Sequence, residues 1–353
     1  MDGEIVHDAA RAALAALAVS GGSTSTDHHY LFPPAAGELL EPSIRAASGL
    51  GMRFHPCRGS MDLGASQGGL PPDEVVEDRD AVLAATEEAI DRWHDPAPGA
   101  MLRIAVGPCS PFSVTEGLMT ESAALARRRG VRLHTHLAET IDEERFCQER
   151  FGVRPVEYLD GLDWLGPDVW LAHCVHLSAA EVARLGATGT GVAHCPSSNG
   201  RLGSGIAPVA DLVAAGVAVG LGVDGAASNE GGELALELRE ALLVARLRGG
   251  PAAMSARTAL ALGTIHGARC LGREDELGSL EPGKLADIAL WRVDGPGQAG
   301  MADPVATLVM GPPRPVAHLL VNGAPVVEEG RLLTADPDEV ARGAASAGAR
   351  LAG

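Results

Sequence analysis

Short apolar runs alternate with amphipathic stretches along most of the first 224 residues. Several of the runs are apolar at nearly every position, and Val217–Asp224 is the clearest example. Strands that are apolar on both faces are typical of a parallel sheet covered by helices. The predicted strands are Gly22–His28, Met52–Arg58, Leu102–Cys109, Val131–Leu137, Val169–Cys174, Gly191–Cys195 and Val217–Asp224.

Helical patterns separate most of these strands and continue after the last one. They span Asp73–Trp93, Thr115–Arg129, Asp142–Arg150, Ser178–Leu185, Val209–Ala215, Glu230–Leu247 and Ser255–Leu262. The repeated strand–helix unit predicts an α/β protein, either a (β/α)8 TIM-like barrel or a doubly wound sheet.

Polar residues at the strand ends favour the barrel. They are Asp27-His28-His29, His55 with Arg58, Cys109-Ser110, His134-Thr135-His136, His173, His194 and Asp224. A barrel gathers the carboxyl ends of its strands around one mouth, whereas an open sheet spreads them along an edge.

The pattern changes after residue 270. From Gly278 onward, short strands and Gly/Pro turns predict half of a small β-sandwich, and Pro337–Leu351 is predicted as a terminal helix. We therefore expect a barrel over residues 1–270 and a smaller unit over 271–353.

Composition excludes several classes of protein. With 28 basic and 46 acidic residues the net charge is −18, and aromatic residues make up 3%, which argues against nucleic-acid binding. The longest uncharged apolar run, Leu212–Val223, is too short to cross a membrane. The acidic start does not resemble a signal peptide. Six cysteines without a CxxC pair indicate reduced thiols and a cytoplasmic location.

The strand ends carry candidate chemistry. His136 and Glu139 stand three positions apart across a strand-to-loop turn, where imidazole suits a divalent metal and carboxylate suits proton transfer. Taken singly, His134 and His136 could be an ordinary strand pair with one buried, His173 and His194 could be core histidines, and Asp224 could be a helix cap. Four successive strands that end in His136, His173, His194 and Asp224, together with Glu139, form the constellation of a metal-dependent hydrolase.

The motifs resemble those of the amidohydrolase superfamily, in its cytosine/guanine deaminase-like branch with one metal. They are His136-Leu-Ala-Glu139-Thr, Leu-Ala-His173-Cys, His194-Cys-Pro-Ser-Ser-Asn199, Val-Asp224-Gly-Ala-Ala-Ser228-Asn229 and Gly278-Ser-Leu-Glu-Pro-Gly-Lys-Leu-Ala-Asp287. Within the branch, the segments 25–33, 58–61, 66–73 and 201–205 are most similar to 8-oxoguanine deaminases, and triazine hydrolases share much of the pattern.

The resemblance implies a role for each site residue. His136 and Asp224 would bind Zn²⁺, and Asp224 would also take a proton from water. Glu139 would carry a proton to the substrate, and His173 would polarise the group under attack. His134 would be structural. The candidate substrate-binding residues are Arg58, Gln67, His194, Ser228 and Asn229. The partner would be a small heterocycle, and nothing in the pattern excludes a homo-oligomer.

One feature departs from the family. Its first barrel strand carries a His-x-His pair that supplies two metal ligands, whereas the only such pair here, His134 and His136, belongs to a later strand. We therefore expect a barrel without its first strand, with weakened zinc binding. The functions under consideration are a zinc-dependent deaminase converting 8-oxoguanine to urate and ammonia, a hydrolase of triazines or other aminopurines and aminopyrimidines, and an inactive barrel.

Overall fold

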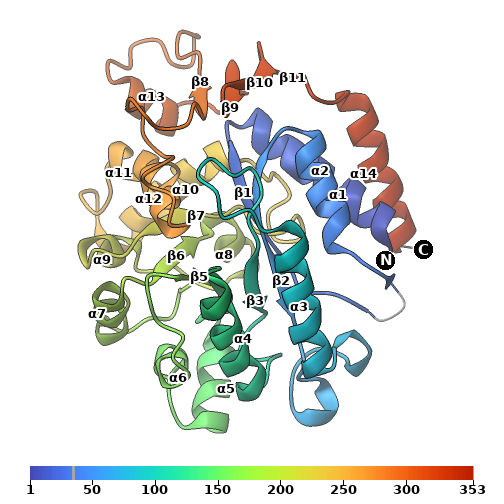
Figure 1. The fold of residues 1–353 in the computed structure, drawn as a ribbon. Coiled ribbons are helices and arrows are strands. Elements are labelled where there is room, and N and C mark those ends of the chain that lie inside the picture. Colours follow the sequence, from blue (N-terminus) through green and yellow to red (C-terminus); the bar gives the residue numbers. More distant parts are fainter. Residues whose placement is uncertain (34–35, 353) are drawn as a thin grey trace.

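A seven-stranded parallel sheet forms the centre of the molecule (Figure 1). In this computed structural model, residues 1–33 and 36–352 are described. The strands are β1 (Thr24–His29), β2 (Arg53–Ser60), β3 (Ala105–Pro108), β4 (Leu133–Leu137), β5 (Val169–His173), β6 (Gly191–His194) and β7 (Val219–Leu221). Neighbours in the sheet follow chain order and all pairs are parallel. All seven predicted strands are confirmed, most of them shorter than predicted.

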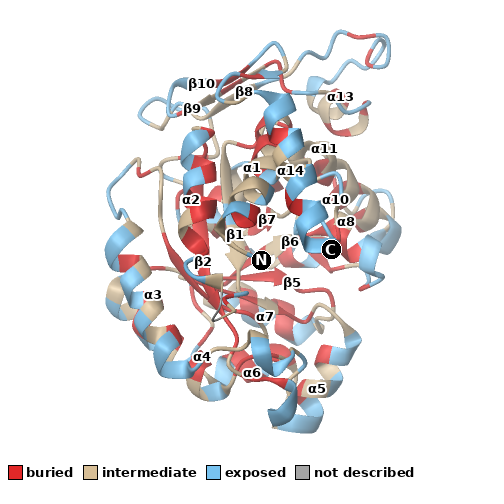
Figure 2. Cartoon of the chain, turned by 90° about the vertical axis from the view of Figure 1, so that its right-hand side faces the viewer, coloured by how far each residue is buried: buried red, intermediate tan, exposed pale blue. Residues whose placement is uncertain are grey.

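Helices cover the outside of the curled sheet, and their exposed faces point away from the buried strands (Figure 2). They are α1 (Gly3–Val19), α2 (Leu40–Gly49), α3 (Arg79–Trp93), α4 (Glu116–Arg129), α5 (Ile141–Phe151), α6 (Pro155–Gly161), α7 (Ala179–Thr188), α8 (Pro196–Leu202), α9 (Val209–Ala214), α10 (Leu234–Gly249), α11 (Ala256–Leu262) and α12 (Ile265–Cys270). Side-chain caps set several starts: at α7, Ser178 and Glu181 form a reciprocal capping box.

The helix predicted over Asp73–Trp93 is interrupted. A short 3-10 turn, η3 (Asp73–Val75), precedes an extended segment, and α3 begins only after Asp78. The Asp78 carboxylate accepts hydrogen bonds from the backbone N–H groups of Asp80 and Ala81, so it caps the helix there. A second short turn, η2 (Ala65–Gln67), lies in the same β2–α3 connection.

The sheet does not close into a complete barrel. In the part of the chain that the structure describes, β1 pairs only with β2 and β7 only with β6. A cavity of about 400 Å³ lies beside both edges, with Thr24 and Thr26 of β1 and Leu221 of β7 in its lining. The expectation of a barrel that lacks one strand is therefore confirmed.

A small antiparallel sheet follows the barrel. It contains β8 (Ile288–Leu290), β9 (His318–Val321), β10 (Ala324–Glu328) and β11 (Arg331–Leu332), in the order β11-β10-β9-β8. Leu319 and Val321 are buried, whereas the Leu290 side chain is half exposed. A buried ion pair between Arg53 Nη2 and Asp287 Oδ1, 2.9 Å apart, joins this sheet to β2.

The chain ends in a helix that returns to the barrel. The α13 helix (Pro304–Met310) precedes β9, and α14 (Pro337–Ala352) follows β11. The α14 helix packs along α1, which places the two ends of the chain side by side (Figure 1). The described helices include none with the length and apolar content needed to span a membrane.

Candidate active site

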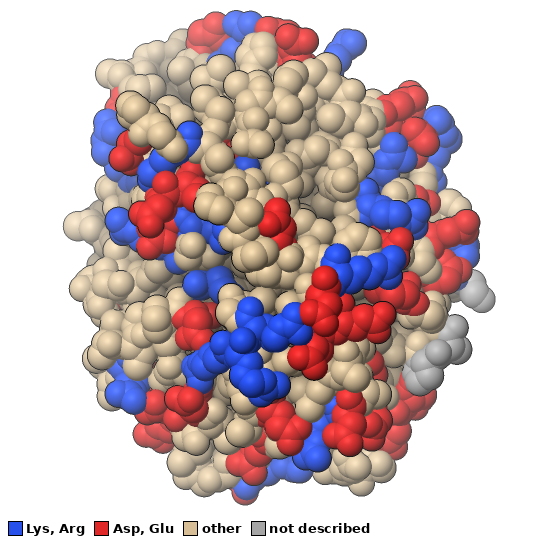
Figure 3. Space-filling view, viewed as in Figure 1, with Lys and Arg blue, Asp and Glu red and all other residues tan. Residues whose placement is uncertain are grey.

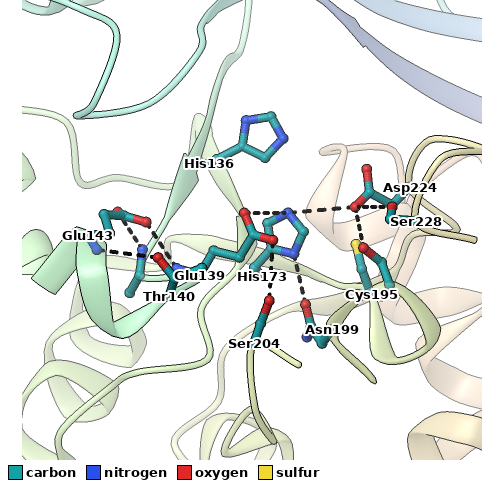
Figure 4. A network of polar contacts seen from close by, with 12 residues as sticks. His136, Glu139, Thr140, Glu143, His173, Cys195, Asn199, Ser204, Asp224 and Ser228 are labelled. Atoms are coloured by element: carbon teal, nitrogen blue, oxygen red, sulfur yellow. Dashed lines mark hydrogen bonds and ion pairs between the residues drawn. The ribbon is translucent and has the colours of Figure 1, made fainter. Parts of the chain in front are cut away.

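Four predicted site residues come from the carboxyl ends of neighbouring strands. His136 lies on β4, His173 and His194 end β5 and β6, and Asp224 follows β7. The rings of His136 and His173 stack with centroids 5.4 Å apart. His173 Nε2 lies 3.7 Å from Glu139 Oε2 and 3.9 Å from Asp224 Oδ2 (Figure 4). The structure thus brings one imidazole nitrogen between two carboxylates.

Unusual backbone conformations aim these side chains into the site. Ala138, His173, Cys174 and Asp224 have φ values of 51°, 68°, 51° and 64°. Left-handed conformations are costly for residues other than glycine and persist where the surroundings enforce them, commonly at functional sites. The strain lies at the turns that follow β4, β5 and β7.

The His173 ring is fixed from its other side. Its Nδ1 lies 2.9 Å from Oδ1 of Asn199, and the side chain is 2% exposed. An amide oxygen only accepts, so Nδ1 carries a proton and donates it to Asn199. Nε2 is the nitrogen left to face Glu139 and Asp224.

Asp224 is held by three donors. Its Oδ2 accepts hydrogen bonds from Ser198 Oγ at 2.5 Å and from Ser228 Oγ at 3.2 Å, and its Oδ1 accepts from the Gly225 N–H at 2.7 Å. Burial alone would raise the pKa of Asp224, but the Ser198 hydrogen bond, the nearby His173 and the Gly225 N–H together lower it. Asp224 is therefore ionised at neutral pH.

The His136 and His134 rings have different surroundings. His136 Nδ1 lies 2.9 Å from the carbonyl oxygen of Cys109 and donates to it, which leaves Nε2 available as a ligand atom. His134 Nδ1 donates to the carbonyl oxygen of Trp170 at 3.0 Å, and the two rings stack. Burial lowers the pKa of His134 to about 3, so this ring is neutral, in keeping with a structural role.

The structure places His194 and Ser228 close to these groups. Ser228 donates to Asp224, as noted above. His194 is buried, and neither of its ring nitrogens has a hydrogen-bond partner among the described residues. Burial and the proximity of His173 lower the pKa of His194 to about 3.

Three other predicted substrate residues are engaged elsewhere or lie at the surface. The Asn229 amide donates to Val223 O at 2.9 Å and to Glu237 Oε1 at 2.8 Å. The Arg58 guanidinium pairs with Glu77 and lies 3.7 Å from the centre of the Phe32 ring. The side chain of Gln67 is exposed on η2. The structure does not show Arg58 or Gln67 in contact with His136, Glu139, His173 or Asp224.

Sequence reasoning missed several supporting residues. They are Glu143, Ser198, Asn199, Ser204 and Glu237, each of which hydrogen-bonds to a predicted site residue. The pattern Thr140-x-x-Glu143, a capping-box signature, could have drawn attention to Glu143. Ser198 and Asn199 lie in the quoted motif His194-Cys-Pro-Ser-Ser-Asn199, and Ser204 lies in the quoted segment 201–205, but neither pattern indicates which site residue each one contacts.

The donors fit a divalent metal in kind but not in number. Imidazole and carboxylate are suitable ligands for zinc, which needs three or four protein groups. Within residues 1–33 and 36–352, no three His, Cys, Asp or Glu side chains lie close enough together to hold one ion.

Comparison with known proteins places the chain in a family. A model of the amidohydrolase family matches residues 1–326. An 8-oxoguanine deaminase of Pseudomonas aeruginosa is 47% identical over 98% of this chain and 77% of its own length. A hydroxydechloroatrazine ethylaminohydrolase of Pseudomonas sp. is 38% identical over 98% of this chain and 72% of its own.

Solved structures agree with these sequence matches. The atrazine chlorohydrolase of Arthrobacter aurescens, solved with zinc, has a TM-score of 0.94 and 36% identity, over 98% of this chain and 77% of its own. An adenosine deaminase of Xanthomonas campestris with bound zinc has a TM-score of 0.89 and 26% identity, over 99% and 76%. Relatives with bound zinc support a divalent metal in this group of hydrolases. The chain belongs to the amidohydrolase family.

Proposed function

We propose that this protein is a hydrolytic deaminase of an aminated heterocycle, with 8-oxoguanine as its substrate and urate and ammonia as products. The observation that carries the proposal is the position of His173 Nε2 between Glu139 and Asp224. Two carboxylates and an imidazole within about 4 Å can move the protons that such a reaction requires.

In the proposed reaction, water adds its oxygen to the ring carbon that bears the amino group, and the carbon–nitrogen bond breaks. One water hydrogen ends on the departing nitrogen, which leaves as ammonia. Asp224, ionised and held by Ser198 and Ser228, accepts the first proton. Glu139 carries a proton to the ring nitrogen, and His173 polarises the group under attack. The proposed ligand roles of His136 and Asp224 imply a divalent metal, which would supply Lewis acidity, although two protein ligands are fewer than zinc normally takes.

The choice of substrate rests on the resemblance to 8-oxoguanine deaminase. Triazines are the alternative, since relatives named for triazine substrates also match nearly the whole chain. His194, Ser228, Asn229, Arg58 and Gln67 remain proposed contacts of the substrate. For Arg58 and Asn229 this role requires their present partners, Glu77 and Glu237, to share them.

The proposal includes zinc as the metal and the cytoplasm as the location. All six cysteines are free and buried, as expected of thiols in a reducing compartment.

The test is ammonia release from 8-oxoguanine, guanine, isocytosine and a hydroxytriazine, with and without added zinc. We expect release that is fastest with 8-oxoguanine and that requires added zinc, because the expected zinc binding is weak. Faster release from the hydroxytriazine would favour the alternative substrate class. No release from any of the four, with or without zinc, would contradict the deaminase proposal and favour an inactive barrel.

A further inference from the structure

We propose that Glu143, on the first turn of α5, is a positioning residue that orients Glu139 by holding the backbone between β4 and α5. This inference rests on the proposed function, because Glu139 is its proton carrier. It concerns a buried carboxylate that the proposed reaction does not otherwise use.

Glu143 binds two consecutive backbone N–H groups. Its Oε1 accepts from Ala138 N at 2.7 Å and its Oε2 accepts from Glu139 N at 3.0 Å (Figure 4). The residue is 1% exposed. Thr140 caps the same helix by accepting from the Glu143 N–H at 3.3 Å. In an ordinary capping box the glutamate returns to the N–H of the cap residue. Here it reaches past Thr140 to the two preceding residues.

The bound peptide also contacts the turn that carries His173. Ala138 is left-handed, with φ 51°. Its carbonyl oxygen accepts hydrogen bonds from the N–H groups of Val175 and His176, both at 2.9 Å. Glu143 thus holds the N–H group of Ala138, while the carbonyl group of Ala138 is held by the turn that follows β5. Without Glu143, the direction of the Glu139 side chain relative to His173 would no longer be set.

The carboxylate has no cationic partner among the described residues. The titratable groups that affect or are affected by its charge are Glu139, Cys147 and Cys174. Burial raises the pKa of Glu143 to about 7, although its two backbone hydrogen bonds lower it. Protonation turns one of the two oxygens into a hydroxyl, which is a poorer acceptor, so it weakens one of the two contacts. A buried acid without a salt bridge costs stability, which is unusual for a residue that only caps a helix.

The experiment compares Glu143→Gln with Glu149→Gln in the full chain. Glu149 is an exposed residue of the same helix and serves as the control. The first measurement is hydrogen exchange of the Ala138 and Glu139 amides, which does not depend on activity. We expect exchange to accelerate at least about tenfold in Glu143→Gln, since a hydrogen bond to a charged acceptor is lost, and to be unchanged in Glu149→Gln.

The second measurement is the pH profile of deamination with the best substrate. Misplacement of Glu139 should lower kcat about 10- to 100-fold with little change in KM. In the wild type, kcat should rise as the pH passes about 7 and Glu143 becomes ionised, and this rise should be absent in Glu143→Gln. Unchanged exchange at Ala138 and Glu139, or a lowered melting temperature with an unaltered kcat and pH profile, would overturn the proposal. If Glu143→Gln does not fold, hydrogen exchange of the wild-type chain at pH 8 tests the proposal instead. Amides of Ala138 and Glu139 that exchange without protection would refute the positioning role of Glu143.

The two proposals fail in different ways. A wild-type chain that releases no ammonia disproves the deaminase function, while the exchange measurement still shows whether Glu143 holds the turn. Normal deamination by Glu143→Gln disproves the positioning role and leaves the function intact.

Discussion

Glu139 and Asp224 lie beside the same imidazole nitrogen, but their surroundings differ. The Asp224 carboxylate accepts three hydrogen bonds, whereas the Glu139 carboxylate accepts one weak hydrogen bond, from Ser204 Oγ at 3.5 Å. Asp224, whose carboxylate is held by three donors, is suited to a role that requires a fixed position. A loosely bound carboxylate can swing between proton donor and acceptor, which suits Glu139 to proton transfer.

Glu139→Gln should therefore reduce deamination by about 100- to 10,000-fold, because the amide keeps the shape but cannot carry the proton. Its melting temperature should stay close to that of the wild type, since the lost hydrogen bond is weak. Steady-state ammonia release and a thermal melt are sufficient to check this. Turnover near the wild-type rate would assign the proton transfer to another group.

His194 should make the fold sensitive to acid. Its pKa is lowered from 6.5 to about 3 by burial, so the unfolded chain binds a proton that the folded chain does not. The resulting stability is present above pH 6.5 and is lost as the pH falls from 6.5 towards 3. His194→Gln should flatten the pH dependence of the unfolding free energy in this window, measured by denaturant titration. An unchanged slope would show that His194 is protonated in the folded state.

At the scale of elements, two strands meet closely where β1 and β2 approach their carboxyl ends. Gly59 of β2 packs against the backbone of β1, and a Cβ atom added there would lie 2.3 Å from the carbonyl oxygen of His29. The backbone cannot move away without disturbing the strand pair that presents His28 and Arg58.

Gly59→Ala should destabilise the protein by about 1–3 kcal/mol through this overpacking. Gly161→Ala is the matched control, because a Cβ at this last residue of α6 meets nothing within 4 Å, and alanine there should leave the stability nearly unchanged or raise it slightly. Chemical denaturation of the two variants gives both values. Equal stability of Gly59→Ala and wild type would show that β1 and β2 can separate.

At the scale of the whole molecule, the open sheet and the surface charge have opposite effects. The free edges of β1 and β7 offer unpaired backbone groups to another strand. The net charge of −18 opposes association. On the face seen in Figure 3 basic side chains lie next to acidic ones. One such surface ion pair joins Arg129 Nη1 to Glu87 Oε1 at 3.0 Å.

We expect the chain to associate through these edges and to have a low melting temperature. Added salt should increase the association, because it screens the repulsion between the negatively charged molecules. Thr26→Lys, at the exposed position of β1, should reduce association, whereas Ala124→Lys, exposed on α4, adds the same charge without effect on the edge. Light scattering against protein concentration distinguishes them. A single sharp monomer peak with cooperative, high-temperature unfolding would contradict the prediction.

Local sequence was enough to identify the seven strands and the residues at their ends. Apolar runs of strand length identify buried parallel strands, and parallel strands bring their carboxyl ends to one side, so His136, His173, His194 and Asp224 could be expected to lie near one another. Glu139 could be expected near them as well, because it follows the carboxyl end of β4 by two residues.

Only the tertiary structure decided which polar groups are free and which are engaged. Arg58 is paired with Glu77, Asn229 is held by Glu237, and Glu143 binds the turn before its own helix. These contacts depend on how loops fold back over strand ends, and no periodicity in the chain encodes that path. The open edge between β1 and β7 was expected from comparison with the family's motifs, and no apolar periodicity indicated it. Apolar periodicity indicates which positions of one segment are buried. The hydrogen-bond partners of polar side chains and the closure of the sheet into a barrel depend instead on distances between segments that are far apart in the sequence.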